Sequence, residues 1–218
     1  MKKKYEIFYN KKINKLNLPS NIITRIFLSR FSPIKNNFIN KKILDFSCGS
    51  GPYLNFFLQL KFKVFATEIT TKIIKKLKKK FPRIIFKLSN NSKIHFANEQ
   101  FDYIFCNHSI YYLNSKNDLF SNTINEISRI TKVGGIIICT FPTINQYHLK
   151  FKKIKDRIYK IIYDKYLIRK NGYFFLFKNL KEINNYFKKK FKIVQSGRQT
   201  VSFGSLNESF FILILKKK

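Results

Sequence analysis

Short apolar runs alternate with amphipathic helical patterns between residues 41 and 141, and no other feature of the sequence restricts its fold as strongly. The strand-like runs lie at 41–46, 63–67, 83–88, 101–106 and 135–141. Strands that alternate with helices predict a parallel sheet with right-handed crossovers. We therefore expect an α/β fold: a doubly wound, mostly parallel seven-stranded sheet with helices on both faces, which is a three-layer α/β/α sandwich.

Capping residues and prolines mark the helices between these strands. The expected helices are 52–60, which begins at Pro52; 71–81, which Thr70 or Thr71 caps and Pro82 ends; and 119–130, which follows a capping-box pattern of Ser115 and Asp118. The pair Gly134-Gly135 then predicts the turn into the fifth strand.

The N-terminal residues follow a different pattern from the rest of the chain. Residues 1–40 are typical of helices, with a break at Leu18-Pro19-Ser20. We therefore expect an N-terminal helical cap over 1–40 and one main domain over 41–218.

The pattern changes again after Pro142. We expect a basic amphipathic helix over 146–169, and a shorter helix from Asn179 to Lys190 that opens with a capping box of Asn179 and Glu182. Two strands with no helix between them, at 191–195 and 209–215, predict an antiparallel hairpin that closes the chain.

The chain is strongly basic, with 44 Lys and Arg against 11 Asp and Glu and a formal net charge of +33. Only 7 of the basic residues are Arg, the side chain that phosphate and base recognition favour. We therefore interpret most of the charge as a solvated lysine surface, which can still bind polyanions without specificity.

The cysteines and the apolar segments indicate the cellular compartment. Cys48, Cys106 and Cys139 are widely spaced within apolar runs, so they predict small buried side chains rather than a disulfide framework or a zinc site. Apolar stretches such as 210–215 are too short to cross a bilayer, and the first residues lack the apolar core of a signal peptide. We expect a cytoplasmic protein without a transmembrane segment.

The turn after the first strand carries two glycines and an acidic residue. Gly49 and Gly51 can bring bare backbone against a ligand, and the helix start beyond them presents free N–H groups. The residues after Gly51 do not fit a dinucleotide fingerprint, and the absence of a G-K-[ST] sequence excludes a P-loop. Asp45, which stands where a phosphate site would have a lysine, favours a cationic or neutral ligand.

Glu68 follows the second strand and lies 23 positions after Asp45. An acidic residue at about this spacing accepts hydrogen bonds from ribose hydroxyls in nucleotide-binding sheets. The alternative is an exposed carboxylate at the start of the next helix. Because the chain has only 11 acidic residues, an acid at this junction favours ribose binding.

In their order and spacing, these segments resemble the class I, Rossmann-like S-adenosylmethionine-dependent methyltransferases, in particular the small type 11/12 branch. The resemblance covers about residues 41–142 well and the remainder loosely. It is carried by ILDFSCGSG (43–51), FATE (65–68), the segment 89–113 and ITKVGGIIICTFP (130–142). It implies that 41–218 form a methyltransferase domain with S-adenosylmethionine as cofactor.

By position, the resemblance also implies which residues bind the cofactor: Asp45, Ser47, Gly49, Gly51, Glu68, Asn90, Cys106 and Asn107. The first four would hold the methionine moiety, and Glu68 would accept the ribose hydroxyls. Asn90 stands where an Asp often contacts the adenine amino group; its amide can accept but carries no charge. Ser47 replaces the first glycine of the motif, which requires that its φ be negative.

His108 directly follows the fourth strand and is the best candidate for a general base, because its imidazole can titrate near neutrality. The alternative is a histidine of the pocket wall without a role in proton transfer. Tyr111 and Tyr112 are expected to line the acceptor pocket, with core packing as the alternative. The sequence thus predicts methyl transfer to an oxygen or nitrogen of a small acceptor: a metabolite, sugar or lipid-linked intermediate.

A second hypothesis is an RNA- or membrane-surface-binding protein on the same fold, which includes the case of an RNA methyltransferase. The helix expected at 146–169 separates the two hypotheses. One continuous lysine stripe would favour polyanion binding, and scattered lysines would favour the small acceptor.

Overall fold

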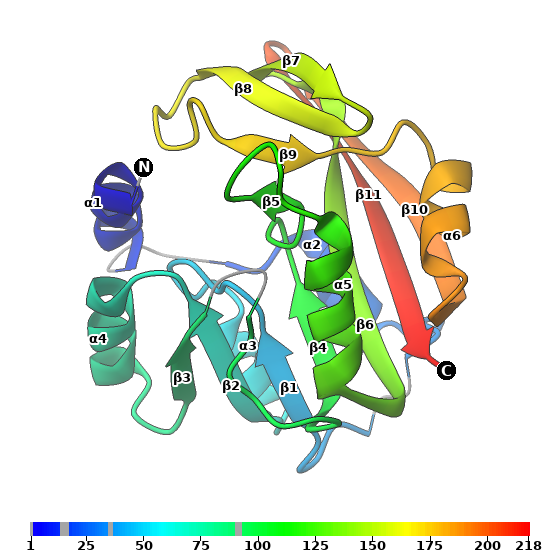
Figure 1. Ribbon diagram of the computed structural model, residues 1–218. Coiled ribbons are helices and arrows are strands. Elements are labelled where there is room, and N and C mark those ends of the chain that lie inside the picture. Colours follow the sequence, from blue (N-terminus) through cyan, green and yellow to red (C-terminus); the bar gives the residue numbers. More distant parts are fainter. Residues whose placement is uncertain (1, 14–17, 35–36, 90–92) are drawn as a thin grey trace.

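The computed structural model describes residues 2–13, 18–34, 37–89 and 93–218, which form a mixed sheet with helices on both faces (Figure 1). The strands are β1 (Lys42–Asp45), β2 (Lys63–Glu68), β3 (Ile85–Leu88), β4 (Phe101–Cys106), β5 (Tyr112–Leu113), β6 (Thr131–Gln146), β7 (Leu149–Lys155), β8 (Ile158–Asp164), β9 (Tyr173–Phe175), β10 (Phe191–Phe203) and β11 (Leu206–Lys217). The helices are α1 (Lys2–Ile13), α2 (Asn21–Leu28), α3 (Leu54–Gln59), α4 (Thr71–Lys80), α5 (Phe120–Ile130) and α6 (Leu180–Phe187).

The predicted doubly wound core is confirmed, with seven strands in the order β3-β2-β1-β4-β6-β11-β10. β1, β2, β3, β4 and β6 run parallel, whereas β11 pairs antiparallel with both β6 and β10. The winding direction reverses between β1 and β4, which are direct neighbours. Ligands of such sheets bind outside the carboxyl ends of the strands at this reversal.

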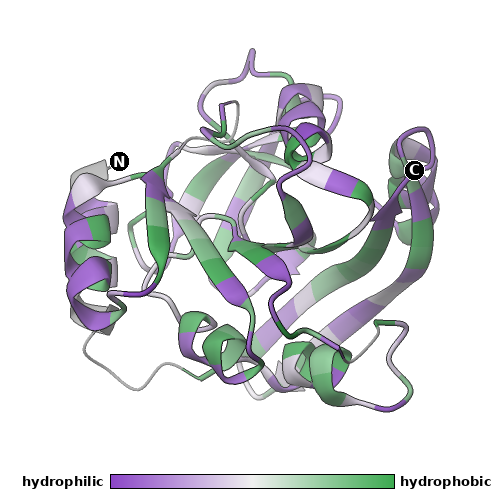
Figure 2. Cartoon of the chain, turned by 90° about the horizontal axis from the view of Figure 1, so that it is seen from below, coloured by the Kyte–Doolittle hydropathy of each residue, from purple (hydrophilic) through white to green (hydrophobic). Residues whose placement is uncertain are grey.

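Two apolar clusters lie on opposite faces of the sheet. Along β1, Ile43 belongs to one cluster and Leu44 to the other, as expected for alternate side chains of a strand. The first cluster contains Phe57 of α3 and Leu77 of α4, and the second contains Ile127 of α5. Figure 2 shows apolar residues along the strands of the sheet and both apolar and hydrophilic residues on the helices.

The prediction of a helix over 146–169 is wrong. These residues form β7 and β8, antiparallel strands that continue from the end of β6 and pair onward with β9. Phe151, Ile158 and Ile161 have helical spacing, but β-branched and aromatic residues dominate β8 and favour a strand. Pairing with the neighbouring strands outweighs the helical pattern. Because this helix is absent, the arrangement of its lysines cannot serve to separate the two functional hypotheses.

Two helices begin later than the sequence predicts. α3 begins at Leu54, so Pro52 precedes the helix instead of opening it. α5 begins at Phe120, and the Ser115 hydroxyl donates to Asp118 Oδ1 at 2.8 Å in a turn ahead of the helix. The expected Ser115–Asp118 interaction is present, but it does not cap the helix.

The C-terminal elements agree better with the prediction. Asn179 caps α6, because its side chain accepts the backbone N–H of Glu182 at 2.9 Å, although the helix ends at Phe187. The antiparallel hairpin of β10 and β11 is confirmed, and both strands are longer than expected. Cys48, Cys106 and Cys139 are free and buried, as predicted.

The N-terminal residues are helical on either side of the predicted break. α2 begins after Pro19-Ser20 and buries Ile23 and Phe27, and α1 lies beside α4 (Figure 1). Neither α1, α2 nor any other helix of the described residues is long and apolar enough to span a membrane. The division into a cap over 1–40 and a domain over 41–218 stays a prediction.

Candidate cofactor and acceptor site

The loop between β1 and α3 is fastened to the end of β2. Cys48 N–H donates to the carbonyl of Thr67 at 2.9 Å, and Ser47 N–H donates to Thr67 Oγ1 at 3.0 Å. Gly49 and Gly51 have φ of 58° and 77°, in the left-handed region that glycine tolerates best. The two glycines of the motif thus occupy positions that require them.

The expectation of a negative φ at Ser47 is wrong, since its φ is 59°. A left-handed conformation costs an L-residue about 1–2 kcal/mol. The hydrogen bond from Ser47 N–H to Thr67 Oγ1 helps to hold this residue in place.

Ser47→Gly is expected to stabilise the protein by about 1 kcal/mol, because glycine adopts a positive φ without strain. Thermal unfolding should show a Tm higher by about 2–4 °C. Ser47→Ala is the matched control: it removes the same hydroxyl but keeps the strained φ, so its Tm should not rise. An equal gain for both variants would contradict a backbone cause.

The two glycines face different surroundings. A Cβ on Gly51 would lie 2.7 Å from Leu54 Cδ1, inside the core, so Gly51 is needed for packing. A Cβ on Gly49 would lie 2.7 Å from Cε1 of Tyr9, which belongs to α1. Gly49 is therefore the glycine whose bare backbone faces the outside of the sheet edge.

The predicted convergence of Glu68 with the glycine loop is present. Gly49 N–H donates to Glu68 Oε2 at 2.9 Å, and Ile69 N–H donates to Oε1 at 2.6 Å. The hydroxyl of Tyr5 on α1 also donates to Oε2, at 3.3 Å. Glu68 is fully buried, so the alternative of an exposed helix-start carboxylate does not hold.

Two buried carboxylates share this end of the sheet. Burial raises the pKa of Glu68 to about 7 and that of Asp45 to about 8, and the charge of Glu68 adds to the shift at Asp45. No described basic side chain forms an ion pair with either one, and Asp45 Oδ2 has no hydrogen-bond partner among the described residues. The site therefore suits a ligand with positive charge.

Helix α1 covers this loop. Tyr5 and Tyr9, one turn apart, lie with their ring centroids 4.4 Å from each other and face Glu68 and Gly49. Burial raises the pKa of both phenols above the ordinary value. The side of the glycine loop that faces away from the core thus contacts side chains of the N-terminal helix.

The residues after β4 form a hydrogen-bonded row. Asn107 Nδ2 donates to Tyr53 Oη at 3.1 Å, and Thr140 Oγ1 donates to Asn107 Oδ1 at 3.1 Å. Cys106, by contrast, packs in the apolar cluster beneath α5. Asn107 is therefore held next to the loop, whereas the Cys106 thiol points into the core.

His108 lies at the edge of a pocket. Its backbone has a positive φ of 53°. Its backbone N–H donates to Thr140 Oγ1 at 2.8 Å, its Nδ1 lies 3.3 Å from the same oxygen, and its ring packs edge-on against Phe210. Although part of the His108 side chain is exposed, desolvation in the pocket, followed by the charge of Arg169, lowers the pKa of His108 to about 4. Titration near neutrality, expected from the sequence, is therefore not found.

The pocket has a volume of about 250 Å³ and lies between α1, the end of β4 and the β6–β9 extension. Its lining is mostly aromatic: Phe8, Tyr9, His108, Tyr111, Pro142, Gln146, Tyr147, His148, Leu149, Tyr166, Arg169, Phe174, Glu208 and Phe210. Tyr111 lines this pocket, whereas Tyr112 stacks behind Tyr111 with ring centroids 5.0 Å apart. That Tyr111 contacts the acceptor stays a prediction.

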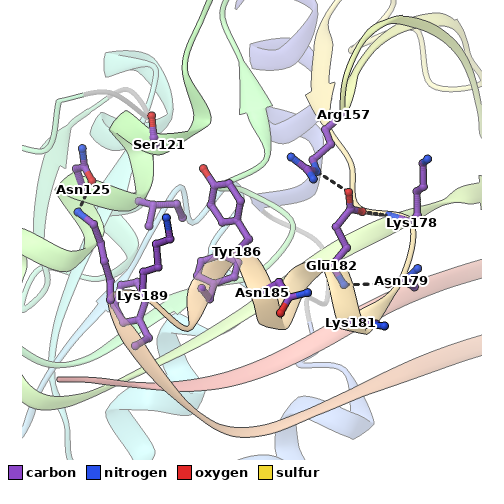
Figure 3. A pocket seen from close by; sticks show the side chains of 14 residues that line it. Ser121, Asn125, Arg157, Lys178, Asn179, Lys181, Glu182, Asn185, Tyr186 and Lys189 are labelled. Carbon is purple, nitrogen blue, oxygen red and sulfur yellow. Dashed lines mark hydrogen bonds and ion pairs between the residues drawn. The ribbon is translucent and has the colours of Figure 1, made fainter.

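A second groove, of about 710 Å³, lies between α5 and α6 (Figure 3). Two of its charged side chains pair with each other: Arg157 Nε donates to Glu182, and Glu182 also accepts the backbone N–H of Lys178. This groove does not touch the loops after β1, β2 and β4. We therefore place the candidate site at the strand ends.

The sequence did not identify several residues of the site. Tyr5, Tyr9, Arg169 and His148 come from segments outside the recognised motifs, whereas Thr140 lies within the motif 130–142 but was not singled out. Among these residues only Arg169 could have been noticed in the sequence, because it is one of just 7 arginines in the chain. Asn90 lies outside the described residues.

Comparison with known proteins assigns the family. Residues 44–139 match the family model for a methyltransferase domain, type 11. The chain carries a class I, S-adenosylmethionine-dependent methyltransferase domain. No curated protein matches the chain in sequence.

Solved structures share the fold of this methyltransferase at low sequence identity. A protein from Pyrococcus horikoshii OT3 is 17% identical with a TM-score of 0.63, and the match covers 96% of this chain and 91% of that one. A methyltransferase from Methanosarcina mazei is 16% identical with a TM-score of 0.64, covering 92% and 98%. The 1,6-didemethyltoxoflavin-N1-methyltransferase of Burkholderia thailandensis, solved with 1,6-didemethyltoxoflavin and S-adenosylhomocysteine, is 14% identical with a TM-score of 0.61, covering 83% and 72%.

The residues at the sheet edge fit S-adenosylmethionine, the cofactor of this family. Its ammonium and sulfonium groups are cations, and Asp45 and Glu68 are buried carboxylates without a described counter-charge. Its ribose hydroxyls are donors, and Glu68 Oε2 already accepts a hydroxyl from Tyr5. Of the described residues, Asp45 and Glu68 would hold the cofactor by charge, and Gly49 would approach it with bare backbone.

Proposed function

We propose that this methyltransferase transfers the methyl group of S-adenosylmethionine to an oxygen or nitrogen of a small-molecule acceptor. The observation that carries the proposal is the 250 Å³ pocket lined by aromatic side chains at the carboxyl ends of β4 and β6. It lies next to the row of Tyr53, Asn107 and Thr140 that leads to the glycine loop. Its small volume favours a metabolite over a sugar chain or a lipid-linked acceptor.

When bound, the cofactor supplies a methyl group that its sulfonium already activates. Asp45, Glu68 and Gly49 bind and orient it, with Ser47 and Gly51 shaping the loop and Asn107 beside it. Positioning alone can supply on the order of 7–11 kcal/mol of the barrier. The chain must then only place the acceptor and remove a proton from it.

His108 is the proposed proton acceptor. Thr140 Oγ1 donates its hydrogen to Asn107, so it can only accept from His108. This arrangement places the imidazole hydrogen on Nδ1 and leaves the lone pair on Nε2. His108 Nε2 would take the proton that the acceptor heteroatom loses when it receives the methyl group, which the bound cofactor would supply.

His108→Asn is expected to lower turnover by about 100-fold while leaving the affinity for the cofactor unchanged. Asparagine tolerates the positive φ at this position, so the fold is retained. Steady-state kinetics on the true acceptor, together with cofactor binding by calorimetry, tests both parts. The control His95→Asn alters an exposed histidine after β3 and should change neither. An unaltered turnover in His108→Asn would leave His108 as a wall residue.

Helix α1 has to move when the cofactor binds. Tyr5 occupies the Glu68 oxygen that the ribose hydroxyls need, and Tyr9 covers Gly49. Ser20, at the start of α2, is tied to Tyr53 through its backbone N–H. The same helix also provides Phe8 and Tyr9 to the acceptor pocket.

Methyl-labelled S-adenosylmethionine tests the proposed acceptor class. The full chain is incubated with the labelled cofactor and a cell extract separated into small metabolites, lipids and RNA. Label in the small-metabolite fraction is the expected result. Label only in RNA would overturn the small-molecule acceptor and support the second hypothesis. A Glu68→Ala variant, which should transfer little label, controls for background methylation by the extract.

A further inference from the structure

The acceptor pocket contains one arginine that the structure holds firmly in place. Asp164, at the end of β8, is buried, and its carboxylate accepts the backbone N–H groups of Tyr166, Ile168 and Arg169 at 2.9, 3.0 and 2.6 Å. These bonds fix the loop that carries Arg169. Arg169 Nε then donates to Tyr112 Oη on β5 at 2.8 Å, which anchors the guanidinium a second time.

This guanidinium has hydrogen-bonding capacity left over. Its Nη1 is buried and has no hydrogen-bond partner among the described residues, although it forms an ion pair with Asp164, whose Oδ1 lies 3.7 Å away. His148, which lines the same pocket, has a buried Nδ1 that also lacks a partner. Leaving a buried donor without a partner is unfavourable, so a pocket that retains one is suited to a ligand that accepts hydrogen bonds.

The charges of the pocket favour an anion with a single negative charge. Arg169 is the only Lys or Arg among the described lining residues. Burial, followed by the charge of Arg169, lowers the pKa of both His108 and His148 to about 4. Both imidazoles are therefore neutral near pH 7. The carboxylate of Asp164 accepts three backbone N–H groups and also forms an ion pair with Arg169, and Glu208 is the acidic residue of the described lining. One guanidinium matches a carboxylate better than a doubly charged phosphate.

The remaining walls favour a flat ring. The Phe210 ring lies 4.3 Å from the His108 ring, and Phe174 packs edge-on against Tyr111 at 4.8 Å. Aromatic side chains in these orientations offer faces and edges to a planar ligand. Resting on the proposed function, we infer that the acceptor is a small aromatic or heteroaromatic carboxylic acid whose carboxylate binds Arg169.

Matched probes test this inference by calorimetry on the full chain with S-adenosylhomocysteine present. 4-Hydroxybenzoate is expected to bind about 10- to 100-fold more tightly than its neutral isostere 4-hydroxybenzamide, as for a charge-assisted hydrogen bond. Arg169→Gln should remove this preference. Arg169→Lys keeps the positive charge but loses the paired N–H donors of the guanidinium, so it should retain part of the preference. Arg157→Gln is the control, since Arg157 lies in the groove beside α6.

The outcomes separate the inference from the proposed function. The inference is overturned if the amide binds as tightly as the carboxylate, if no carboxylate binds, or if Arg169→Gln keeps the preference. Tighter binding of phenyl phosphate would overturn the choice of a carboxylate. Binding of S-adenosylhomocysteine, measured in the same titrations, should be unaffected by Arg169→Gln. If the unaltered protein does not bind S-adenosylhomocysteine, that result would instead count against the proposed function itself.

Discussion

Glu68→Gln is expected to weaken binding of S-adenosylmethionine by about 10- to 100-fold. The substitution keeps the size of the side chain but replaces the carboxylate, which accepts hydrogen bonds from the ribose hydroxyls, with a neutral amide. Charge-assisted hydrogen bonds contribute about 1.5–3 kcal/mol, which corresponds to this loss of affinity. Isothermal calorimetry measures the affinity, and circular dichroism checks that the variant is folded.

Two further variants make this test specific. Asp102→Asn removes a carboxylate that pairs with Lys132 at 2.8 Å at the start of β4, the opposite edge of the sheet, so cofactor affinity should not change. Tyr5→Phe removes the hydroxyl that donates to Glu68 in the cofactor-free protein and should raise affinity by about 2- to 10-fold. Equal affinity in the unaltered protein and Glu68→Gln would remove Glu68 from the site.

The sequence predicts the central part of the fold well because local pattern and tertiary contacts agree there. β4 runs from 101 to 106 as expected, since its apolar residues are buried on both faces of the sheet. The convergence of Glu68 with Gly49 is equally predictable, because parallel strands bring their carboxyl ends to one edge.

The same reasoning fails where long-range pairing decides the structure. Residues 149–164 carry apolar side chains at helical spacing, but β6 extends to Gln146 and provides the start of a hairpin. No local signal in those residues encodes the length of β6. The φ of Ser47 is a similar case, because Thr67, 20 residues further along, helps to hold it.

The acceptor side of the site depends on these unpredicted parts. Arg169 reaches the pocket only because β8 ends at Asp164 and the following loop folds over its carboxylate. Tyr5 and Tyr9 reach Glu68 and Gly49 from a helix without a motif. The cofactor is therefore predictable from the sequence in this chain, whereas the chemistry of the acceptor pocket requires the three-dimensional structure.

Affinity for S-adenosylmethionine is expected to rise by at least about tenfold between pH 6 and pH 8. Burial raises the pKa of Glu68 to about 7 and that of Asp45 to about 8 in the cofactor-free protein. Both carboxyls are therefore largely protonated at pH 6, whereas a cationic ligand favours their ionised forms. A group with a pKa near 7 is ionised to about one tenth at pH 6 and about nine tenths at pH 8.

Binding of the cofactor must then release protons. The stability of the cofactor-free protein must fall as pH rises, whereas the affinity for the cofactor rises. Because the folded pKa values lie above the unfolded values, the cofactor-free protein loses stability as pH rises from about 4 towards 8. Calorimetry at pH 7 in two buffers of different ionisation enthalpy should show net proton release, and Glu68→Gln should show less. Glu126→Gln, a carboxyl whose pKa Arg129 lowers, is the control and should leave the release unchanged. A pH-independent affinity would contradict the placement of the cofactor's positive charge beside these two carboxylates.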